Sequence, residues 1–249
     1  IQHIILNMKY EKIVSGIFVS RPNRFIAHVL IDGTEEIVHV KNTGRCKEIL
    51  VPGCKVYLED FEGQMGKRKL RYSLIAVEKK RCLSDSDCGR NDSCKDYEMI
   101  LINMDSQAPN KVVGEWLSTQ GYTFNKSEYK YGDSRIDFYM EKGTDKYLLE
   151  VKGCTLENNG HCKFPDAPTE RGVKHLHELI KAREKGYRTA VLILVQMEKV
   201  TDFSPNDETH KAFGDTLRLA ARKGVEILCY NCKVTPDSLE LKDKVKVVL

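Results

Sequence analysis

Short runs of alternating apolar and polar residues, separated by turn signals, occupy the first third of the chain. A period of two indicates strands that bury one face. Asp32-Gly33 is a good hairpin turn, and Pro52-Gly53 separates two later runs. The expected strands are Ile13–Val19, Arg24–Ile31, Glu35–Val40, Lys55–Asp60 and Lys69–Val77. Five short strands in about seventy residues favour a small β-barrel of the oligonucleotide-binding (OB) type.

The remainder of the chain alternates helix-like and strand-like segments. Apolar positions recur at helical spacing after Pro109, and Gly121 ends this expected helix. The expected elements that follow are strands Arg135–Met140 and Tyr147–Val151, a helix Thr169–Lys185, a strand Thr189–Val195, a helix Asn206–Lys223 and a strand Val225–Tyr230. This order predicts an α/β sandwich with a mixed sheet.

A change of composition divides the chain into two domains. Residues 81–95 are rich in Asp, Ser, Arg, Asn and Cys, which is typical of a linker or an exposed loop. We therefore expect a barrel over residues 8–80, a cysteine-containing linker over 81–95 and an α/β domain over 96–249. Met8 is the expected native start, with residues 1–7 as upstream sequence.

Composition restricts the class of protein but does not identify a partner. With 41% hydrophobic and 31% charged residues, the chain can bury a real core. No apolar run is long enough for a membrane-spanning helix, so we expect a cytoplasmic protein with no membrane partner. The net charge of +4, from 40 basic and 36 acidic residues, is too even to indicate nucleic-acid binding by itself. One basic cluster, Lys67, Arg68, Lys69 and Arg71, could bind nucleic acid or be a solvated strand or turn.

Nine cysteines without an export signal are expected to be reduced thiols. Cys82, Cys88 and Cys94 lie in the polar segment, and Cys229 and Cys232 form a C-x-x-C pattern. A zinc or iron-sulfur site is the alternative, but the gaps between the first three are not a standard ligand spacing. Plain thiols are therefore the preferred interpretation.

The most informative chemistry lies in two neighbouring strands. If Gly143-Thr144 is the centre of the connecting turn, antiparallel pairing sets Asp137 opposite Glu150. Directly opposed residues have Cβ atoms roughly 5 Å apart, where like charges repel unless a cation lies between them. Alternation places Lys152 on the same face as Glu150. The residues expected on the other face are Phe138, Leu149 and Val151.

This trio suits phosphodiester hydrolysis. Two carboxylates can bind Mg²⁺ or Mn²⁺ through hard oxygen ligands. A nearby lysine can orient or deprotonate an attacking water and stabilise charge on a phosphate. The alternative is an exposed strand pair with ordinary surface charges.

Met8 to Leu249 resembles the sugar fermentation stimulation protein A family. The matching stretches are Arg21–Ala27 (RPNRFIA), His39–Gly44 (HVKNTG), Gln107–Asn110 (QAPN), Tyr131–Phe138 (YGDSRIDF), Glu150–Leu156 (EVKGCTL) and Phe164–Leu176 (FPDAPTERGVKHL). The resemblance implies an OB-type barrel joined to a domain with the PD-(D/E)xK nuclease fold, DNA binding, and a link to the regulation of sugar metabolism. It also implies that Asp137, Glu150 and Lys152 occupy the nuclease-motif positions.

Further residues are candidates to support this site. The resemblance places Glu115 at an acidic position that many nuclease-fold members bring towards the metal; the alternative is a surface glutamate. Apolar Val173 and Leu176 define the buried stripe of the following helix, so Lys174 and His175 are expected on or beside its opposite face. There they could touch a scissile phosphate or hold the carboxylates, or they could simply be solvated.

In the barrel, Arg21, Arg24, Asn42 and Arg45 could contact phosphate oxygens, although Asn-Thr-Gly is also a good turn in any β domain. A helix-turn-helix motif near the C-terminus is not expected, because the segment after Gly224 is β-rich. Contacts with DNA should therefore be made mainly to the backbone and should depend steeply on salt.

Two functions are compatible with these patterns. In the first, the protein binds DNA and has a nuclease site that depends on Mg²⁺ or Mn²⁺. In the second, it is a non-catalytic, largely sequence-nonspecific DNA-binding regulator of sugar (maltose-type) metabolism. RNA is a possible substrate in either case. The patterns are compatible with an enzyme and with a non-catalytic protein.

Overall fold

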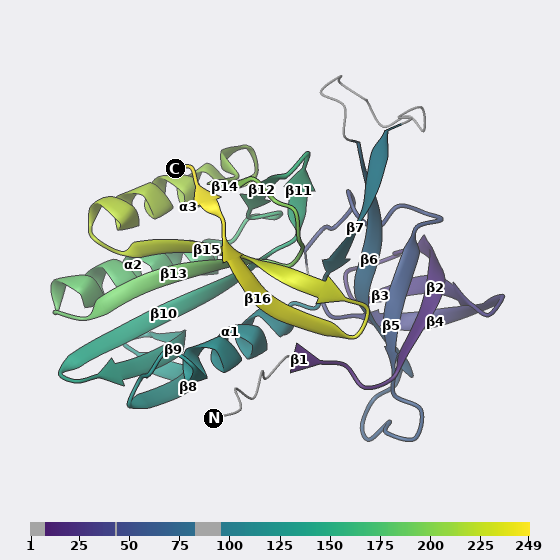
Figure 1. Cartoon of the computed structure of the whole chain (residues 1–249), viewed down its shortest axis with the longest axis horizontal. Coiled ribbons are helices and arrows are strands. Elements are labelled where there is room, and N and C mark those ends of the chain that lie inside the picture. Colours follow the sequence, from purple (N-terminus) through teal and green to yellow (C-terminus); the bar gives the residue numbers. More distant parts are fainter. Residues whose placement is uncertain (1–7, 43, 83–95) are drawn as a thin grey trace.

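The structure, a computed structural model, describes residues 8–42, 44–82 and 96–249. A β-barrel and a larger α/β domain lie side by side (Figure 1). The barrel strands are β2 (Ile13–Ser20), β3 (Ile26–Ile31), β4 (Thr34–Val40), β5 (Lys55–Asp60) and β6 (Tyr72–Cys82). Their order is β4-β3-β2-β5-β6, and pairing of β4 with β6 closes the barrel. The predicted OB-type fold is confirmed.

Strand β7 (Tyr97–Asn103) departs from the expected domain boundaries. It pairs antiparallel with β6, from Cys82 opposite Tyr97 to Ala76 opposite Asn103. The barrel sheet therefore extends beyond residue 80 and ends at Asn103, because the return strand after residues 81–95 joins the barrel rather than the second domain. Cys82 is disulfide-bonded, which corrects the expectation of a plain thiol at this position. Cys88 and Cys94 lie outside the described residues.

The second domain is built on a seven-stranded mixed sheet in the order β1-β16-β15-β13-β10-β9-β8. Its strands are β1 (Met8–Lys9), β8 (Phe124–Tyr131), β9 (Ser134–Lys142), β10 (Asp145–Cys154), β13 (Arg188–Val195), β15 (Glu226–Thr235) and β16 (Ser238–Lys244). Strands β10, β13 and β15 run parallel. Strand β1, expected in the barrel, instead pairs with β16. The exposed edge strand β8 was not predicted, because its sequence lacks the alternation that a half-buried strand requires.

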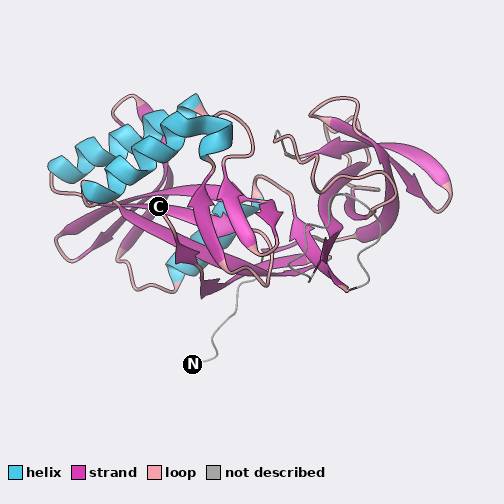
Figure 2. Ribbon diagram, turned by 90° about the horizontal axis from the view of Figure 1, so that it is seen from above, coloured by secondary structure: helices cyan, strands magenta, loops and turns pink. Residues whose placement is uncertain are grey.

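Helices cover both faces of this sheet. Helix α1 (Ala108–Ser118) lies on one face, and α2 (Glu170–Glu184) and α3 (Asp207–Arg222) lie together on the other (Figure 2). Each predicted helix is confirmed. Strand β15 follows α3 directly, as expected from the β-rich sequence after Gly224. A small sheet of β11 (Leu156–Asn158), β12 (His161–Phe164), β14 (Asp202–Pro205) and β17 (Lys246–Val247) completes the described elements.

Buried charges hold the two domains together. The carboxylate of Glu157, in the second domain, is fully buried and lies 2.6 Å from Lys79 Nζ and 3.2 Å from Arg81 Nη1 of β6. Arg81 also donates to the Lys199 carbonyl at 2.8 Å. Such contacts fix one domain against the other. Among the described helices, none combines the length and the apolar character needed to cross a membrane.

Candidate metal centre

The β9–β10 hairpin has the predicted register. Phe138 lies opposite Leu149 and Tyr139 opposite Leu148. One further step in this register sets Asp137 opposite Glu150, at the point where the regular pairing ends. Phe138, Leu149 and Val151 pack in the core on the α1 side, as expected. The position of the turn therefore sets the register that brings the two carboxylates opposite each other.

Asp137 lies where β9 changes its alternation. Ile136 packs in the core on the α2 side, whereas Phe138, two residues later, packs on the α1 side. A regular strand would place both on one face. The Asp137 side chain turns towards β10, where Oδ2 accepts a hydrogen bond from the Val151 amide at 2.7 Å. Burial, together with the charge of Glu150, raises the pKa of Asp137.

Glu150 is 2% exposed, and its two carboxylate oxygens differ in their hydrogen bonding. Oε1 accepts hydrogen bonds from His175 Nδ1 and Lys152 Nζ. Oε2 is buried without any hydrogen-bond partner among the described residues. Burial alone raises the pKa of this carboxyl, but the His175 hydrogen bond and the Lys152 charge outweigh it, so the pKa is lowered. Glu150 is therefore an ionised carboxylate with one oxygen left unsatisfied.

Helix α2 positions His175 against this carboxylate. His175 is 4% exposed and packs beside Leu176, which corrects its expected place on the opposite helix face. Its Nε2 accepts from Arg171 Nε at 3.3 Å, so Nδ1 carries the proton donated to Glu150. Lys174 is bonded elsewhere: its ammonium donates to the Asp133 carbonyl, between β8 and β9, at 2.9 Å.

Helix α1 brings Asn110, rather than Glu115, to the acidic pair. Asn110 Nδ2 donates to Asp137 Oδ1 at 2.9 Å. Glu115 instead receives a hydrogen bond from the Met8 backbone, and burial raises its pKa. Sequence reasoning did not assign Asn110 to the site, although it belongs to the QAPN stretch at the helix N-terminus.

The donor set suits a hard cation with few protein ligands. Within the described ranges there is no group of three or more His, Cys, Asp or Glu side chains that could hold a metal ion. Mg²⁺, however, is usually bound by one or two carboxylates and keeps several waters. The unsatisfied Glu150 Oε2 and the neighbouring Asp137 carboxylate fit that requirement.

Two of the predicted nucleic-acid ligands build the barrel loop instead. Both terminal nitrogens of Arg21 donate to backbone carbonyls; those carbonyls belong to Arg24, Asn42, Gly44 and Arg45. The Asn42 amide bridges Gly44 N and the Met104 carbonyl, at 2.7 and 2.9 Å. These contacts match the turn-chemistry interpretation. Arg24 and Arg45 are exposed.

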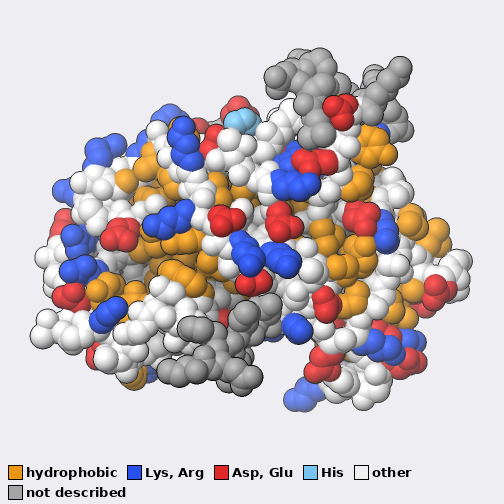
Figure 3. Space-filling view, in the orientation of Figure 1, with side chains coloured by type: hydrophobic (Ala, Val, Ile, Leu, Met, Phe, Trp, Pro, Cys, Tyr) orange, Lys and Arg blue, Asp and Glu red, His pale blue; other side chains and the backbone are white. Residues whose placement is uncertain are grey.

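The basic cluster of residues 67–71 divides in a similar way. Arg71 makes a two-point ion pair with buried Asp60, at 2.7 and 2.9 Å. Arg68 stacks on the Phe61 ring. Lys67 and Lys69 are exposed. Basic and acidic side chains are interspersed over the face in Figure 3, so electrostatic attraction on that face is local rather than continuous.

Comparisons with known proteins agree along the chain. The family model described as "Sugar fermentation stimulation protein RE domain" matches residues 107–238, and "SfsA N-terminal OB domain" matches residues 19–84. A sugar fermentation stimulation protein homolog of Clostridium beijerinckii is 50% identical over 246 residues, covering 97% of this chain and 100% of that protein. One from Desulfitobacterium hafniense is 51% identical over 248 residues, covering 97% and 99%.

A solved structure has the same fold. The structure of Pyrococcus furiosus SfsA in complex with Ca²⁺ matches with a TM-score of 0.78 at 23% identity. The match covers 98% of this chain and 100% of that one. Because two family models and near-full-length relatives of about half identical sequence agree with this fold, the chain belongs to the sugar fermentation stimulation protein family.

Proposed function

We propose that this protein is a nuclease that acts on DNA and depends on a divalent metal ion. The observation that carries the proposal is the buried Oε2 of Glu150, near the Asp137 carboxylate, which has no hydrogen-bond partner in the part of the chain that the structure describes. An unpaired buried carboxylate oxygen is costly, and a cation is its natural partner. Mg²⁺ or Mn²⁺ is the expected ion. The Ca²⁺ complex of Pyrococcus furiosus SfsA supports a divalent cation in this fold.

Each residue of the site has a distinct task. Asp137 and Glu150 would hold the ion, which supplies charge neutralisation at a phosphate and activation of a water when bound. The Lys152 side chain, 18% exposed, can leave Glu150 to meet the phosphate. There its ammonium stabilises the negative charge that develops during attack. Asn110 and the Val151 amide hold Asp137 in place.

The barrel would supply DNA contacts outside the site. Exposed Lys67 and Lys69 lie in the loop between β5 and β6, which corresponds to a loop that OB folds use for nucleic acids. Contacts of this type go to phosphates and carry little sequence information. We therefore expect DNA affinity to fall steeply with rising salt.

A cleavage assay tests the proposal. Wild type, Lys152→Ala and Lys174→Ala are incubated with single-stranded, duplex and branched DNA and with RNA, in Mg²⁺, Mn²⁺ or EDTA, and the products are separated on denaturing gels. Cleavage should require metal, be lost in Lys152→Ala and persist in Lys174→Ala, since the Lys174 ammonium is bonded to the Asp133 carbonyl rather than to Glu150. DNA binding without cleavage in either metal would contradict the nuclease and support a non-catalytic DNA-binding regulator.

A further inference from the structure

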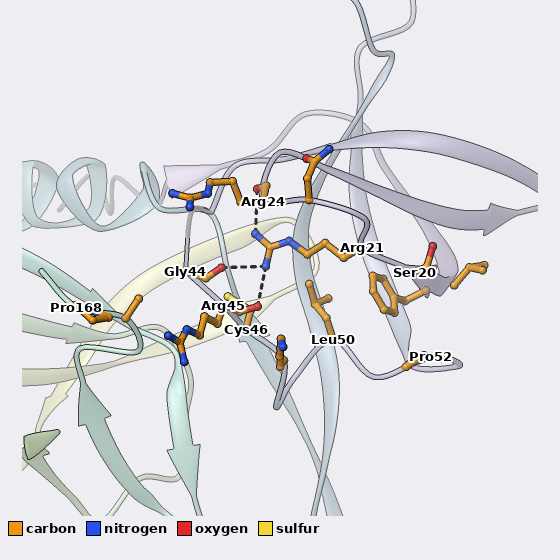
Figure 4. A pocket seen from close by; sticks show the side chains of 14 residues that line it. Ser20, Arg21, Arg24, Gly44, Arg45, Cys46, Leu50, Pro52 and Pro168 are labelled. Carbon is orange, nitrogen blue, oxygen red and sulfur yellow. Dashed lines mark hydrogen bonds between the residues drawn. The ribbon is translucent and has the colours of Figure 1, made fainter. Parts of the chain in front are cut away.

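A cavity of about 720 Å³ lies between the barrel loops and the segment that leads into α2 (Figure 4). Barrel residues form most of its lining, and Ala167 and Pro168 of the second domain close one side. Neither Asp137 nor Glu150 lines it. The metal centre described above therefore leaves this cavity without a role.

The lining of the cavity combines positive charge with an apolar wall. Arg24, Arg45 and Lys47 are exposed cations at this site. Leu50 and Pro52 contribute apolar surface beside them. In Figure 4 the Arg24 and Arg45 side chains extend from the barrel towards the side where Pro168 lies. Cations next to an apolar wall suit a ligand with phosphates on one side and bases on the other.

A second, narrower cavity adjoins the first and includes part of β10 in its lining. Its volume is about 170 Å³, and Gly44 lines both cavities. Its lining also includes Gly153 of β10, directly after Lys152, and Thr155. Asp166 packs against Gly44 in this second cavity, and burial raises the pKa of its carboxyl. Because Gly44 lines both cavities, they adjoin at the boundary between the domains, and we call the two together the interdomain groove.

The domains cannot easily separate to widen this groove. Besides the buried Glu157 cluster, the Gln196 amide donates to Asn103 Oδ1 at 2.9 Å and to the Asp105 carbonyl at 3.1 Å. All three residues are at most 1% exposed. Opening the groove would leave these buried polar groups without partners, at a cost of about 1–3 kcal/mol for each.

We infer that single-stranded DNA is the substrate and that it reaches the metal centre along this interdomain groove, with its phosphates on Arg24, Arg45 and Lys47. This inference rests on the proposed nuclease function. Glu150 is recessed, and a phosphate must leave the general surface to approach it. Duplex DNA is stiff, with a persistence length of about 50 nm, whereas a single strand can bend into a narrow groove.

Fluorescence anisotropy in EDTA tests binding without cleavage. The probes are a labelled oligothymidylate of about 20 nucleotides, longer than the ~4–16 nucleotides that one OB fold covers, and a duplex of equal length. Wild type should prefer the single strand. The double variant Arg24→Ala/Arg45→Ala should bind the single strand about tenfold more weakly. The slope of the logarithm of the binding constant against the logarithm of the salt concentration should become smaller in magnitude by about 1.4, or about 0.7 for each lost phosphate contact. The matched control Arg222→Ala/Lys223→Ala removes two exposed cations from the end of α3 and should change neither value.

Three outcomes would contradict the proposal that single-stranded DNA binds along the groove. These are tighter binding of the duplex, an equal loss in the α3 control, and displacement of the oligonucleotide by thymidine monophosphate at equal concentration. The last result would identify a pocket for a small phosphorylated molecule. Because the assay contains no metal, it is independent of catalysis. If any of these results appeared together with metal-dependent cleavage of duplex DNA, the proposed path of the single strand would be wrong, but the proposed nuclease function would be supported. If the single strand bound in the groove but was not cleaved in metal, only the proposed nuclease function would be wrong.

Discussion

The carboxylate of Glu150 has two oxygens in opposite situations. Donors from His175 and Lys152 occupy Oε1, while Oε2 is buried with no described partner. A carboxylate that needed only internal hydrogen bonds would gain from pairing both oxygens. The asymmetry leaves one oxygen without an internal hydrogen bond among the described residues, as a carboxylate that binds a metal ion would need.

Removing one carboxylate should weaken metal binding. We expect Asp137→Asn to reduce Mn²⁺ affinity at least about 100-fold, because loss of even an outer-shell partner costs about 10–100-fold. Isothermal titration calorimetry measures this directly. Glu115→Gln is the matched control and should bind like wild type, since Glu115 is bonded to the Met8 backbone. If Glu115→Gln lost affinity while Asp137→Asn kept it, the assignment of ligands would be wrong.

Asp60 should make stability depend on acid pH. Hydrogen bonds from Arg71, followed by those from Lys12, hold the pKa of this buried carboxyl well below its usual value. In the unfolded chain the pKa of an aspartate is about 3.9. The contribution of Asp60 to the free energy of unfolding is therefore fully present above that pH and is lost as the pH falls towards the pKa in the folded state. Free energies of unfolding in urea should therefore fall more steeply between about pH 5 and 2.5 for wild type than for Asp60→Asn. Parallel curves would show that Asp60 is not responsible.

At the scale of elements, α2 is the link between packing and chemistry. Thr169 Oγ1 accepts from the Gly172 amide at 3.1 Å and caps the helix, whose buried face carries Leu176 and Leu179 into the core. The same face carries His175 to Glu150. The helix is therefore held by its cap and its apolar contacts, and it can place one polar side chain accurately.

His175 should act by positioning Glu150. We expect His175→Ala to lower Mn²⁺ affinity about 10–100-fold. His175→Asn should recover part of the loss, because its amide can still donate near the position of Nδ1. Calorimetry gives the affinity, and circular dichroism checks that both variants are folded. Equal affinities for Ala and Asn in equally folded proteins would contradict a donor role.

At the scale of the molecule, the domains behave as one body because charged groups are buried between them. Glu157 receives Lys79 and Arg81 from β6, and Arg81 also pairs with Glu98 of β7. Strand β1 adds a second connection, since residues that precede the barrel complete the sheet of the other domain. This rigid arrangement keeps the groove narrow.

Breaking this interface should uncouple the domains. Glu157→Gln leaves two cations near a neutral amide. We expect it to lower the free energy of unfolding by about 3 kcal/mol, which is within the range for removing one partner of a buried ion pair. Urea unfolding followed by Trp116 fluorescence and by circular dichroism should then show two separated transitions. The control Lys211→Ala removes an exposed ion pair with Asp215, and its free energy of unfolding should stay within about 0.5 kcal/mol of the wild-type value. A single wild-type-like transition in Glu157→Gln would show that the interface does not depend on this carboxylate.

The sequence by itself determined the features that depend on local periodicity. The turn at Gly143-Thr144 was sufficient to set the hairpin register that brings Asp137 opposite Glu150, and the alternation of β10 placed Lys152 beside Glu150. Helical spacing with glycine stops located all three helices, and alternation located the barrel strands. These features follow from neighbouring residues, so a linear pattern contains them.

Tertiary structure decided which distant segments meet. Nothing in the local pattern indicates that β1 joins the second domain or that β7 joins the barrel, because edge pairing depends on where the chain returns. His175 lies on the buried face of α2 because it bonds to Glu150, and the helical spacing of apolar residues cannot predict such a polar partner. Arg21 looked like a phosphate ligand until the folded loop presented four carbonyls to it. Polar side chains take their roles from partners far away in the sequence, and only the fold supplies those partners.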